Sequence, residues 1–355
     1  MADARDAADR AMLALLRGHA PLPGPSDPLW DDCARRLTQE ALPGVALGLI
    51  AAAGRLDDLT PGARGHLERE LNKVRAGQVI LLNRFENLID RLQAAGIEFL
   101  VHKGGALAPL IYDRPEDRPM VDIDIIIRPE DWARVRDGLD SWGYRMPRGA
   151  SRAFWLENYY NIAVASPEDP PASFDVHWGI TQEGRYHVRT SDLFERAVPY
   201  TWCGRGLRRM GNEDLLLSLF LHLAYHYFEA RLLWLYDMKR VMERIPIDWD
   251  VVAAHARHGG LETVTALNLS FVDKVFPGVV PPEAVRLTRC GALRKGLLGP
   301  LRSTHPLHLF RGDRHRPVHF ALGLLTIDSP WTAVRFAGDK IARSLRWAGR
   351  SPRTR

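Results

Sequence analysis

The chain has 355 residues, of which 46% are hydrophobic and 26% charged, as is usual for a globular protein. Its cysteines, Cys33, Cys203 and Cys290, lie far apart and form no C-x-x-C pair, which argues against a disulfide framework or a zinc ribbon. The sequence contains no run of 18 apolar residues, and its N-terminus does not resemble a signal peptide. We therefore expect no membrane span and a cytoplasmic location.

The net charge of +5 is unevenly distributed along the chain. Residues 286–355 contain fifteen Lys and Arg against three Asp, so the rest of the chain carries a net negative charge. A basic segment could bind nucleic acid, an anionic membrane surface or an acidic peptide. We favour the alternative, that it forms a solvated, Arg-rich helical surface.

Residues 1–95 are predicted to be helical. Within 78–94 the apolar residues recur at steps of four, three and four, as on one face of a helix: Leu81, Phe85, Leu88 and Leu92. Gly96 follows as a natural end to this helix.

Between residues 96 and 210 the pattern changes to short apolar strands and short helices. Strands are predicted at 97–101, 121–127, 161–165 and 173–178, and helices at 106–112 and 129–142. The order strand, helix, strand, helix and two strands indicates a small α/β core.

From residue 212 onward the chain is again predicted to be helical. Asn212, which precedes two acidic residues, is the candidate N-cap of the first helix. Further helices are predicted at 249–260, 262–275, 283–296 and 331–348.

Two aspartates share one face of the predicted strand at 121–127. Side chains alternate between the faces of a strand, so Asp122 and Asp124 point the same way, with their backbones about 6–7 Å apart. Carboxylates this close repel each other and lose solvation, and a divalent cation such as Mg²⁺ would remove that cost. Asp124→Asn should then cost the metal-free protein little stability, or even raise it. The alternative is an edge strand whose polar face lies in water.

Asp175 is a third carboxylate, and it shares a face of its strand with His177. With the first pair it could hold two metal ions, which suit in-line displacement at phosphorus. One ion would lower the pKa of the attacking hydroxyl, and the other would neutralise the leaving pyrophosphate. We expect Asp122, Asp124 and Asp175 to lie within about 4–6 Å of a common point. Taken alone, Asp175 could also be a surface charge.

Gly104 and Gly105 stand between a strand and a helix. A backbone without Cβ atoms can approach a phosphate closely, and the N–H groups at a helix start attract anions. A Gly-Gly pair is also common in ordinary turns.

These motifs occur in an order that resembles the uncharacterised nucleotidyltransferase family of the polymerase-β-like superfamily. The resemblance covers about residues 75–245, and the first 70 and last 100 residues match it only in being helical. It is carried by Lys103-Gly104-Gly105, Tyr112, Arg118-Pro119, Asp122-Ile-Asp124 and Asp175-Val-His177-Trp178, and by His222, His226, Arg231, Trp234, Tyr236 and Asp237 in LHLAYHYFEARLLWLYDMKR.

The resemblance implies an α+β fold, a small mixed nucleotidyltransferase-type sheet with flanking helices and with N- and C-terminal helical regions. The changes of pattern along the chain divide it into an N-terminal helical region at 1–95, a core at 96–210 that the resemblance makes the nucleotidyltransferase core, and a C-terminal helical domain with a basic tail at 211–355. The implied site residues are the catalytic and metal-binding Asp122, Asp124 and Asp175 and the nucleotide-binding Lys103, Gly104 and Gly105.

The sequence departs from the superfamily's usual pattern at Gly105. That pattern has Gly-Ser, with a hydroxyl for the terminal phosphates, and a shorter gap to the first aspartate. Here Gly105 replaces the serine, and 16 residues separate it from Asp122. Lys103 could supply the missing phosphate contact, or it could pair with a nearby carboxylate.

Residues of the helical signature have less certain roles. His222 and His226 share a helix face at i and i+4, and we expect them to pack against the core instead of binding zinc. Arg231 and Asp237 could form ion pairs near the nucleotide or with each other, and we favour a structural role for both. Among the tryptophans, Trp178 is the best candidate to stack on a base, although most large aromatic residues belong to the core.

The predicted activity is transfer of a nucleoside monophosphate from an NTP, with ATP as the default donor, to a hydroxyl or phosphate of a peptide or small-molecule acceptor. Two Mg²⁺ ions would assist, one on Asp122 and Asp124 and one on Asp175. One alternative is a non-catalytic nucleotidyltransferase-like binding or antitoxin module. Another is an RNA end-modifying nucleotidyltransferase that uses the basic C-terminal region, although the sequence contains no accompanying RNA-binding module.

Overall fold

The computed structural model describes residues 2–19, 21–147, 159–182, 184–226, 231–288, 296, 298–299 and 316–346. Within these residues, helices surround a six-stranded mixed sheet, so the predicted α+β class is confirmed. The hydrophobic core extends from α1 near the N-terminus to α18 near the C-terminus.

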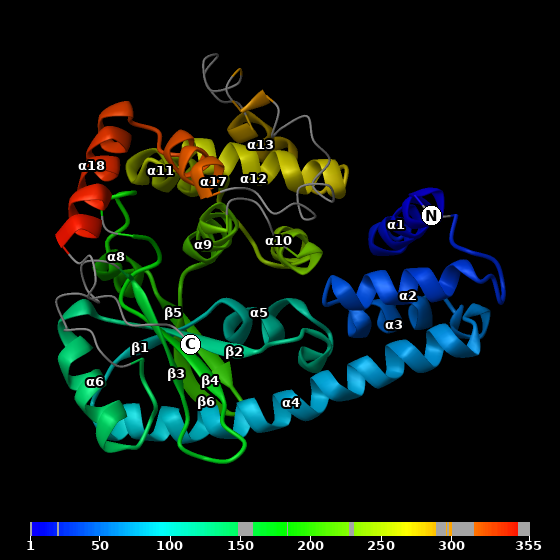
Figure 1. The fold of residues 1–355 in the computed structure, drawn as a ribbon, viewed down its shortest axis with the longest axis horizontal. Coiled ribbons are helices and arrows are strands. Elements are labelled where there is room, and N and C mark those ends of the chain that lie inside the picture. Colours follow the sequence, from blue (N-terminus) through cyan, green and yellow to red (C-terminus); the bar gives the residue numbers. More distant parts are fainter. Residues whose placement is uncertain are drawn as a thin grey trace.

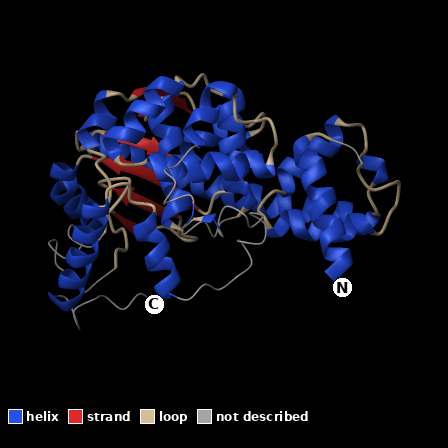
Figure 2. Ribbon diagram, turned by 90° about the horizontal axis from the view of Figure 1, so that it is seen from above, coloured by secondary structure: helices blue, strands red, loops and turns tan. Residues whose placement is uncertain are grey.

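The N-terminal helices form a lobe at one side of the molecule (Figure 2). They are α1 (Ala2–Arg17), α2 (Leu29–Gln39), α3 (Pro43–Ala52) and α4 (Pro61–Ala94). The long α4 runs from this lobe to the sheet (Figure 1), so it joins the two parts.

Both ends of α4 are fixed by local sequence. The hydroxyl of Thr60 accepts a hydrogen bond from the Ala63 amide at 3.0 Å, and Pro61 occupies the first helical turn. At the other end Gly96 has a φ of +64°, and the amides of Gly96 and Ile97 donate to carbonyls of the last turn. The predicted stripe is buried, and its member Phe85 packs against Phe174 and Trp202 of the sheet.

The sheet has the strand order β3-β4-β2-β1-β6-β5. Its strands are β1 (Phe99–His102), β2 (Asp122–Ile127), β3 (Asn161–Ala165), β4 (Ser173–His177), β5 (Val198–Trp202) and β6 (Arg205–Arg209). β2 pairs with β4 in parallel and with β1 in antiparallel orientation. β3 pairs antiparallel with β4, β5 pairs antiparallel with β6, and β6 pairs in parallel with β1. β2 therefore lies in the interior of the sheet.

The hairpin of β5 and β6 and the preceding helix α8 (Thr190–Glu195) were not predicted. The sequence of β6, RGLRR, lacks the apolar alternation that identifies a strand. In the structure Cys203 and Gly204 both adopt positive φ, as a two-residue hairpin turn requires.

Helices cover both faces of the sheet. On one face lie α4 and α6 (Trp132–Ser141), whose Trp132 packs on Trp178 with the ring centroids 4.7 Å apart. The other face carries the aspartates and looks toward α9 (Asn212–Tyr225) and α10 (Leu232–Arg244). Between β1 and β2 the chain forms α5 (Lys103–Ile111) and the short 3-10 turn at Pro115–Asp117.

The C-terminal helices follow the predictions at 249–260, 262–275 and 331–348. They are α11 (Trp249–Gly259), α12 (Glu262–Val275) and α18 (Pro330–Arg346), and α17 (Arg316–Leu325) was not predicted. Of the predicted helix at 283–296, the described part contains the short α13 (Pro282–Val285) and a 3-10 turn, and most of the remainder lies outside the described residues.

Asn212 is not the N-cap of its helix, as was predicted from the acidic residues after it. Gly211 occupies the N-cap position, and Asn212 is the first helical residue. Its side-chain oxygen accepts a hydrogen bond from Arg209 at 2.9 Å, which connects the start of α9 to the end of β6.

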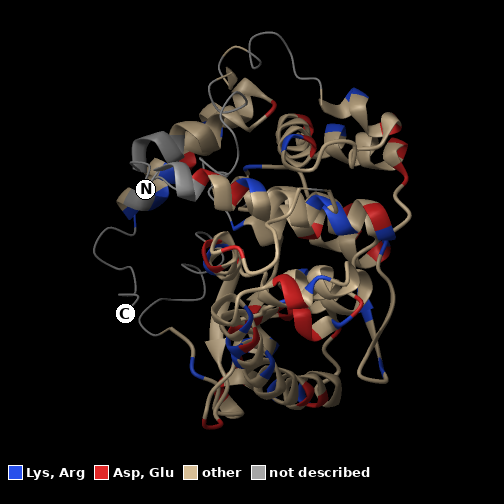
Figure 3. Ribbon diagram, turned by 90° about the vertical axis from the view of Figure 1, so that its right-hand side faces the viewer, with Lys and Arg blue, Asp and Glu red and all other residues tan. Residues whose placement is uncertain are grey.

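Basic and acidic residues are interspersed along the described helices (Figure 3). The described helices include none that is both long enough and apolar enough to cross a bilayer. On α18 several apolar side chains are exposed, namely Trp331, Val334, Ile341 and Leu345. The role of the basic segment 286–355 stays a prediction, because much of it lies outside the described residues.

Candidate active site

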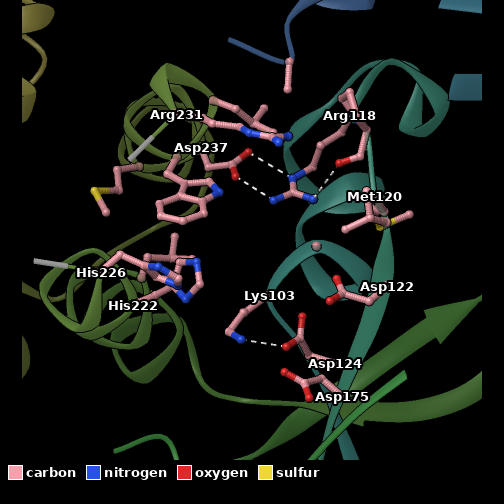
Figure 4. Close-up of a pocket in the computed structure, with 18 of the residues that line it drawn as sticks. Lys103, Arg118, Met120, Asp122, Asp124, Asp175, His222, His226, Arg231 and Asp237 are labelled. Carbon is pink, nitrogen blue, oxygen red and sulfur yellow. Dashed lines mark hydrogen bonds and ion pairs between the residues drawn. The ribbon is translucent and has the colours of Figure 1, made fainter. Parts of the chain in front are cut away.

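A pocket of about 1090 Å³ lies between the sheet and the surrounding helices. Its floor is formed by β2 and β4 and the start of α5, one wall by α9 and α10, and its far rim by the end of α2 (Figure 4). The pocket lining includes all three predicted carboxylates, Asp122, Asp124 and Asp175, together with Lys103 and Gly104.

The strand pairing brings the aspartates together. β2 and β4 run parallel, with Asp124 opposite Asp175, so the two carboxylates stand side by side on one face. Asp124 is only 5% exposed. Because β2 is an interior strand, the alternative of an edge strand with a polar face in water is wrong.

His177 completes the tightest group of potential ligands. Its Nε2 lies 2.9 Å from Asp124 Oδ1 and 3.5 Å from Asp175 Oδ2. One ligand atom each from Asp124, Asp175 and His177 lie within 4.8 Å of one another. Asp122 lines the same pocket but does not belong to this group. Strand periodicity predicted that His177 shares a face with Asp175, but no role was predicted for His177.

Lys103 reaches into the carboxylates from the first residue of α5. Its backbone has a φ of +42°, a left-handed conformation that is strained for a residue with a Cβ atom and is found disproportionately at functional sites. Nζ donates to Asp124 Oδ1 at 2.6 Å. Burial alone would lower the pKa of Lys103, but attraction from the aspartates outweighs it, and the pKa is raised. Lys103 was expected either to contact a phosphate or to pair with a nearby carboxylate, and in this structure it pairs with Asp124.

Asp122 and Asp124 have opposite electrostatic environments although they share a face. Burial, followed by repulsion from Asp124 and Asp175, raises the pKa of Asp122 to about 6. Burial also acts to raise the pKa of Asp124, but Lys103 and His177 together hold it well below its usual value. The repulsion expected between crowded carboxylates is therefore concentrated on Asp122, whereas Asp124 is a stabilised anion.

The two glycines play different parts. Gly104 lines the pocket, and a Cβ there would collide with Arg118 and Met120. Gly105 is not among the pocket-lining residues, and a Cβ there would come within 3.0 Å of Val101 and 3.1 Å of Ile123. Gly104 thus makes room for the side chains of Arg118 and Met120 beside the pocket, and Gly105 lets α5 pack closely on the sheet.

A buried ion pair joins α10 to the segment before β2. Arg118 donates to Asp237 through two nitrogens, at 2.7 and 3.1 Å, and the hydroxyl of Tyr112 donates to the same carboxylate at 2.7 Å. Asp237 therefore has the structural role that we favoured, with Arg118 and Tyr112 as its partners instead of Arg231.

Asp237→Asn should lower the free energy of unfolding by about 3–5 kcal/mol, because it leaves the Arg118 guanidinium buried without a counter-charge. Urea denaturation of the purified variant measures this effect. The matched control is Asp113→Asn, whose carboxylate pairs with Arg244 but is 77% exposed, and which should cost less than about 1 kcal/mol. Equal losses in the two variants would contradict the assignment.

Arg231 faces the pocket from the start of α10 (Figure 4). The other pocket cations are paired, Arg36 with Asp9 and Glu40, Lys103 with Asp124, and Arg118 with Asp237. Within the described part of the chain, Arg231 has no carboxylate partner. No ion pair among the described residues therefore supports the structural role that we favoured for it.

The wall opposite the aspartates is aromatic. His222, His226 and Trp234 pack on one another, with ring centroids 4.3 to 4.9 Å apart. Burial, and then the positive charge of Lys103, lower the pKa of both histidines. Neither belongs to a group of potential metal ligands within the described residues. Their ring contacts in the described chain lie in the pocket wall, with each other, Tyr225 and Trp234, and not with the α/β core as was predicted.

Trp178, the expected candidate for base stacking, does not line the pocket. It is buried against Trp132 on the opposite side of the sheet, because it lies one residue beyond His177 and so points the other way. The aromatic side chains that do line the pocket are Trp234, Tyr160 and Tyr225.

The N-terminal lobe contributes a rim that the sequence did not predict. Residues 36 and 39–41, at the end of α2, line the pocket. Glu40 also accepts a hydrogen bond from the Leu232 amide at 2.8 Å, which connects this rim to the start of α10. No local motif marked these residues, because the contact joins segments about 190 positions apart.

The cluster of Asp122, Asp124 and Asp175 offers the oxygen ligands that a divalent cation needs. Asp175 Oδ1 is buried and has no hydrogen-bond partner in the described part of the chain, although Asn161 donates to Oδ2 at 2.7 Å. A buried carboxylate oxygen without a partner is costly. Together with Asp122 and Asp124, it fits a hard cation that takes oxygen ligands.

Comparisons with known proteins agree with the predicted resemblance. Residues 26–277 match the profile of a family described as uncharacterised nucleotidyltransferase, a longer stretch than the motifs alone covered. No curated protein matches the sequence. A matching solved structure is that of the antibiotic-resistance factor ANT(2'')-Ia, with 12% identity over 50% of this chain and 92% of that chain and a TM-score of 0.35. A likeness this weak does not identify a substrate.

Proposed function

Because the chain belongs to the uncharacterised nucleotidyltransferase family, we propose that it transfers a nucleoside monophosphate from an NTP to an acceptor hydroxyl or phosphate. It is a nucleotidyltransferase, and the proposal concerns its metal, its residues and its substrates. The observation that carries the proposal is the convergence of three carboxylates and Lys103 in one pocket.

In this proposal Asp122 and Asp124 hold the Mg²⁺ ion of the triphosphate, and Asp175 with Asp124 holds a second. When bound, such ions stabilise the charge that develops in phosphoryl transfer. The fixed strands β2 and β4 keep the carboxylates at constant separation, so little reorganisation is needed during the reaction. Asp175, whose Oδ1 has no partner in the described residues, also helps to deprotonate the acceptor.

Lys103 and Gly104 bind the phosphates of the nucleotide in this proposal. Lys103 already lies beside Asp124, so a cation on that carboxylate would compete with it and leave the ammonium group for a phosphate oxygen. Gly104 gives the phosphates access to the start of α5, where backbone N–H groups are free of helical partners. Gly105 supports this turn from behind by its close packing on Val101 and Ile123.

The acceptor is proposed to be a peptide or a small molecule. The pocket is large enough for an NTP and part of an acceptor, and its far rim is polar, with Arg36, Gln39 and Glu40. ATP is the proposed donor, by its abundance. A cytoplasmic location belongs to the same proposal, because NTPs and Mg²⁺ are supplied there.

The test is to incubate the full chain with each α-³²P-labelled NTP, Mg²⁺ and a cell extract, and to follow pyrophosphate release and transfer of label. We expect one NTP to label a peptide or small-molecule fraction, and Asp124→Asn with Asp175→Asn to remove the signal. Label found in RNA would instead support the RNA end-modifying alternative. If the protein binds an NTP but releases no pyrophosphate with any fraction of the cell extract, the proposed reaction is contradicted.

Arg231→Ala should weaken binding of Mg²⁺–NTP by about tenfold, because a charge-assisted contact to a phosphate is worth about 1.5 kcal/mol. Isothermal titration with a non-hydrolysable NTP analogue measures this effect. Arg257→Ala is the control, since Arg257 is an exposed arginine of α11 outside the pocket. Unchanged affinity in Arg231→Ala would remove this residue from the nucleotide site.

A further inference from the structure

We propose that His177 is a direct ligand of the second cation, so that this position has nitrogen as well as oxygen donors and prefers Mn²⁺ to Mg²⁺. The inference rests on the proposed function, since it concerns the same pocket. It assigns different chemistry to the two cation positions, one on Asp122 and Asp124 and the other on Asp124, Asp175 and His177.

The spacing of the potential ligand atoms supports this assignment. Neighbouring ligands of an ion with bonds of about 2.1 Å lie roughly 3.0 Å apart in octahedral and 3.4 Å apart in tetrahedral geometry. His177 Nε2 lies 2.9 Å from an oxygen of Asp124 and 3.5 Å from an oxygen of Asp175. These two edges already have the length that coordination requires, so the ring need not move far to bind an ion.

The ring of His177 is held in this orientation by the fold. The residue is 1% exposed, and its backbone is paired on both sides, with Ile126 of β2 and Asn161 of β3. The rings of His102 and Tyr160 pack against it, with centroids 5.5 and 5.8 Å away. Nε2 is therefore directed at the carboxylates.

A positively charged side chain, that of Lys103, already lies next to Asp124 and His177. The ammonium group of Lys103 lies 2.6 Å from Asp124 Oδ1 and 3.5 Å from His177 Nε2. Positive charge is thus stabilised at a point that both residues touch. A divalent ion would satisfy the same carboxylate, and it would also meet Asp175 through Oδ2, the oxygen that lies 3.5 Å from His177 Nε2.

The donor set predicts the preference between metals. Mg²⁺ is a hard ion that takes oxygen ligands and loses water reluctantly, whereas imidazole suits transition metals. A pair of aspartates offers only oxygen, which matches Mg²⁺–NTP. The position with His177 offers one nitrogen, so Mn²⁺ should bind there more tightly than Mg²⁺.

The competing role for His177 is that of a positioning residue, with Nε2–H donating to Asp124 and no bond to the metal. Nδ1 is buried and has no hydrogen-bond partner within the described residues, so no acceptor there fixes which ring nitrogen carries the proton. The two roles differ in whether nitrogen is coordinated, and a spectroscopic measurement separates them.

The first measurement is pulsed electron paramagnetic resonance on the full chain with Mn²⁺ as the only metal. The second is competition of Mg²⁺ against bound Mn²⁺, which gives the two dissociation constants. We expect the wild type to show ¹⁴N coupling from a directly bound nitrogen, and His177→Gln to lose it. The ratio of the Mg²⁺ and Mn²⁺ dissociation constants should fall at least about tenfold in His177→Gln, because the glutamine amide can offer only an oxygen in its place. Circular dichroism and urea unfolding confirm that the variant is folded.

His222→Gln is the matched control, because His222 lines the same pocket but lies outside the group of potential ligands. It should keep the ¹⁴N coupling. Bound Mn²⁺ without ¹⁴N coupling in the wild type would overturn the inference and leave the proposed function intact. Conversely, coupling in a protein that transfers no nucleotide from any NTP would confirm the ligand and contradict the function.

Discussion

Asp124→Asn should reduce nucleotidyl transfer by at least about three orders of magnitude and should also destabilise the metal-free protein. Asp124 is the carboxylate shared by both proposed cation positions. Metal stabilisation of phosphoryl transfer is worth several kcal/mol, and each 1.4 kcal/mol changes the rate about tenfold. Initial rates of pyrophosphate release, measured over a range of Mg²⁺ concentrations, test the first half of this prediction.

The loss of stability follows from the partners of Asp124. The side chains of Lys103 and Asp124 are 18% and 7% exposed, and their ion pair is 2.6 Å long. Breaking a buried pair leaves the other charge uncompensated, so we expect a loss of about 3 kcal/mol in EDTA. This result is opposite to the sequence-based expectation of little loss or a gain, which considered only repulsion between Asp122 and Asp124.

A double-mutant cycle tests the physical reason. In a Lys103→Met background there is no buried ammonium group, so Asp124→Asn should cost much less than it does in the wild type. Urea unfolding of the four proteins without metal gives the coupling energy. If Asp124→Asn costs the same in both backgrounds, Lys103 is not the reason for its stabilising role.

The site could be predicted from sequence wherever it depends on strand periodicity. Alternation placed Asp122 with Asp124 and Asp175 with His177, and the parallel pairing of β2 and β4 then brought Asp124 beside Asp175. The apolar stripe of α4 was visible for the same reason, because a helix repeats every 3.6 residues.

The remainder depends on contacts between distant segments. The difference between Asp122 and Asp124 arises from Lys103 and His177, which both contact Asp124, and Lys103 does so from a backbone with a left-handed φ. No sequence pattern indicated this conformation. The partner of Asp237 is 119 positions away in Arg118, although the intervening arginine Arg231 is nearer in sequence. Electrostatic roles in this pocket therefore needed the three-dimensional structure.

The same reasoning explains the missed strands. β6 pairs with β1 at a single position, Val101 with Arg209, and with β5 at five positions, and its arginine side chains make further contacts. Arg208, for example, donates to the carbonyls of Phe194 and Ala197 at 2.9 and 3.1 Å. Local propensity underestimates such a strand, because tertiary contacts and not apolar alternation hold it in place.

Asp122→Asn should make the metal-free protein more stable above pH 6 and should leave its stability unchanged below about pH 4. The pKa of Asp122 is raised from 3.8 to about 6 in the folded protein. Between these values the folded state binds a proton at Asp122 that the unfolded state has lost, so the contribution of Asp122 to the stability of the wild type falls as the pH rises. Asparagine does not ionise, and the variant lacks this decline.

The expected gain at pH 7.5 is about 1–3 kcal/mol, since a shift of one pKa unit corresponds to about 1.4 kcal/mol and part of it is screened by solvent. Urea unfolding in EDTA at pH 4, 6 and 7.5, with the wild type in parallel, isolates the contribution of Asp122 from those of other groups. Added Mg²⁺–ATP should stabilise only the wild type, because the variant has lost a ligand of the triphosphate ion. A gain of the same size at pH 4 and pH 7.5 would show that the ionisation of Asp122 is not its cause. Asp122→Asn and Asp124→Asn should therefore change stability in opposite directions, although both abolish activity. This result would distinguish a cation site in which Lys103 neutralises one of the two aspartates from a simple pair of repelling carboxylates.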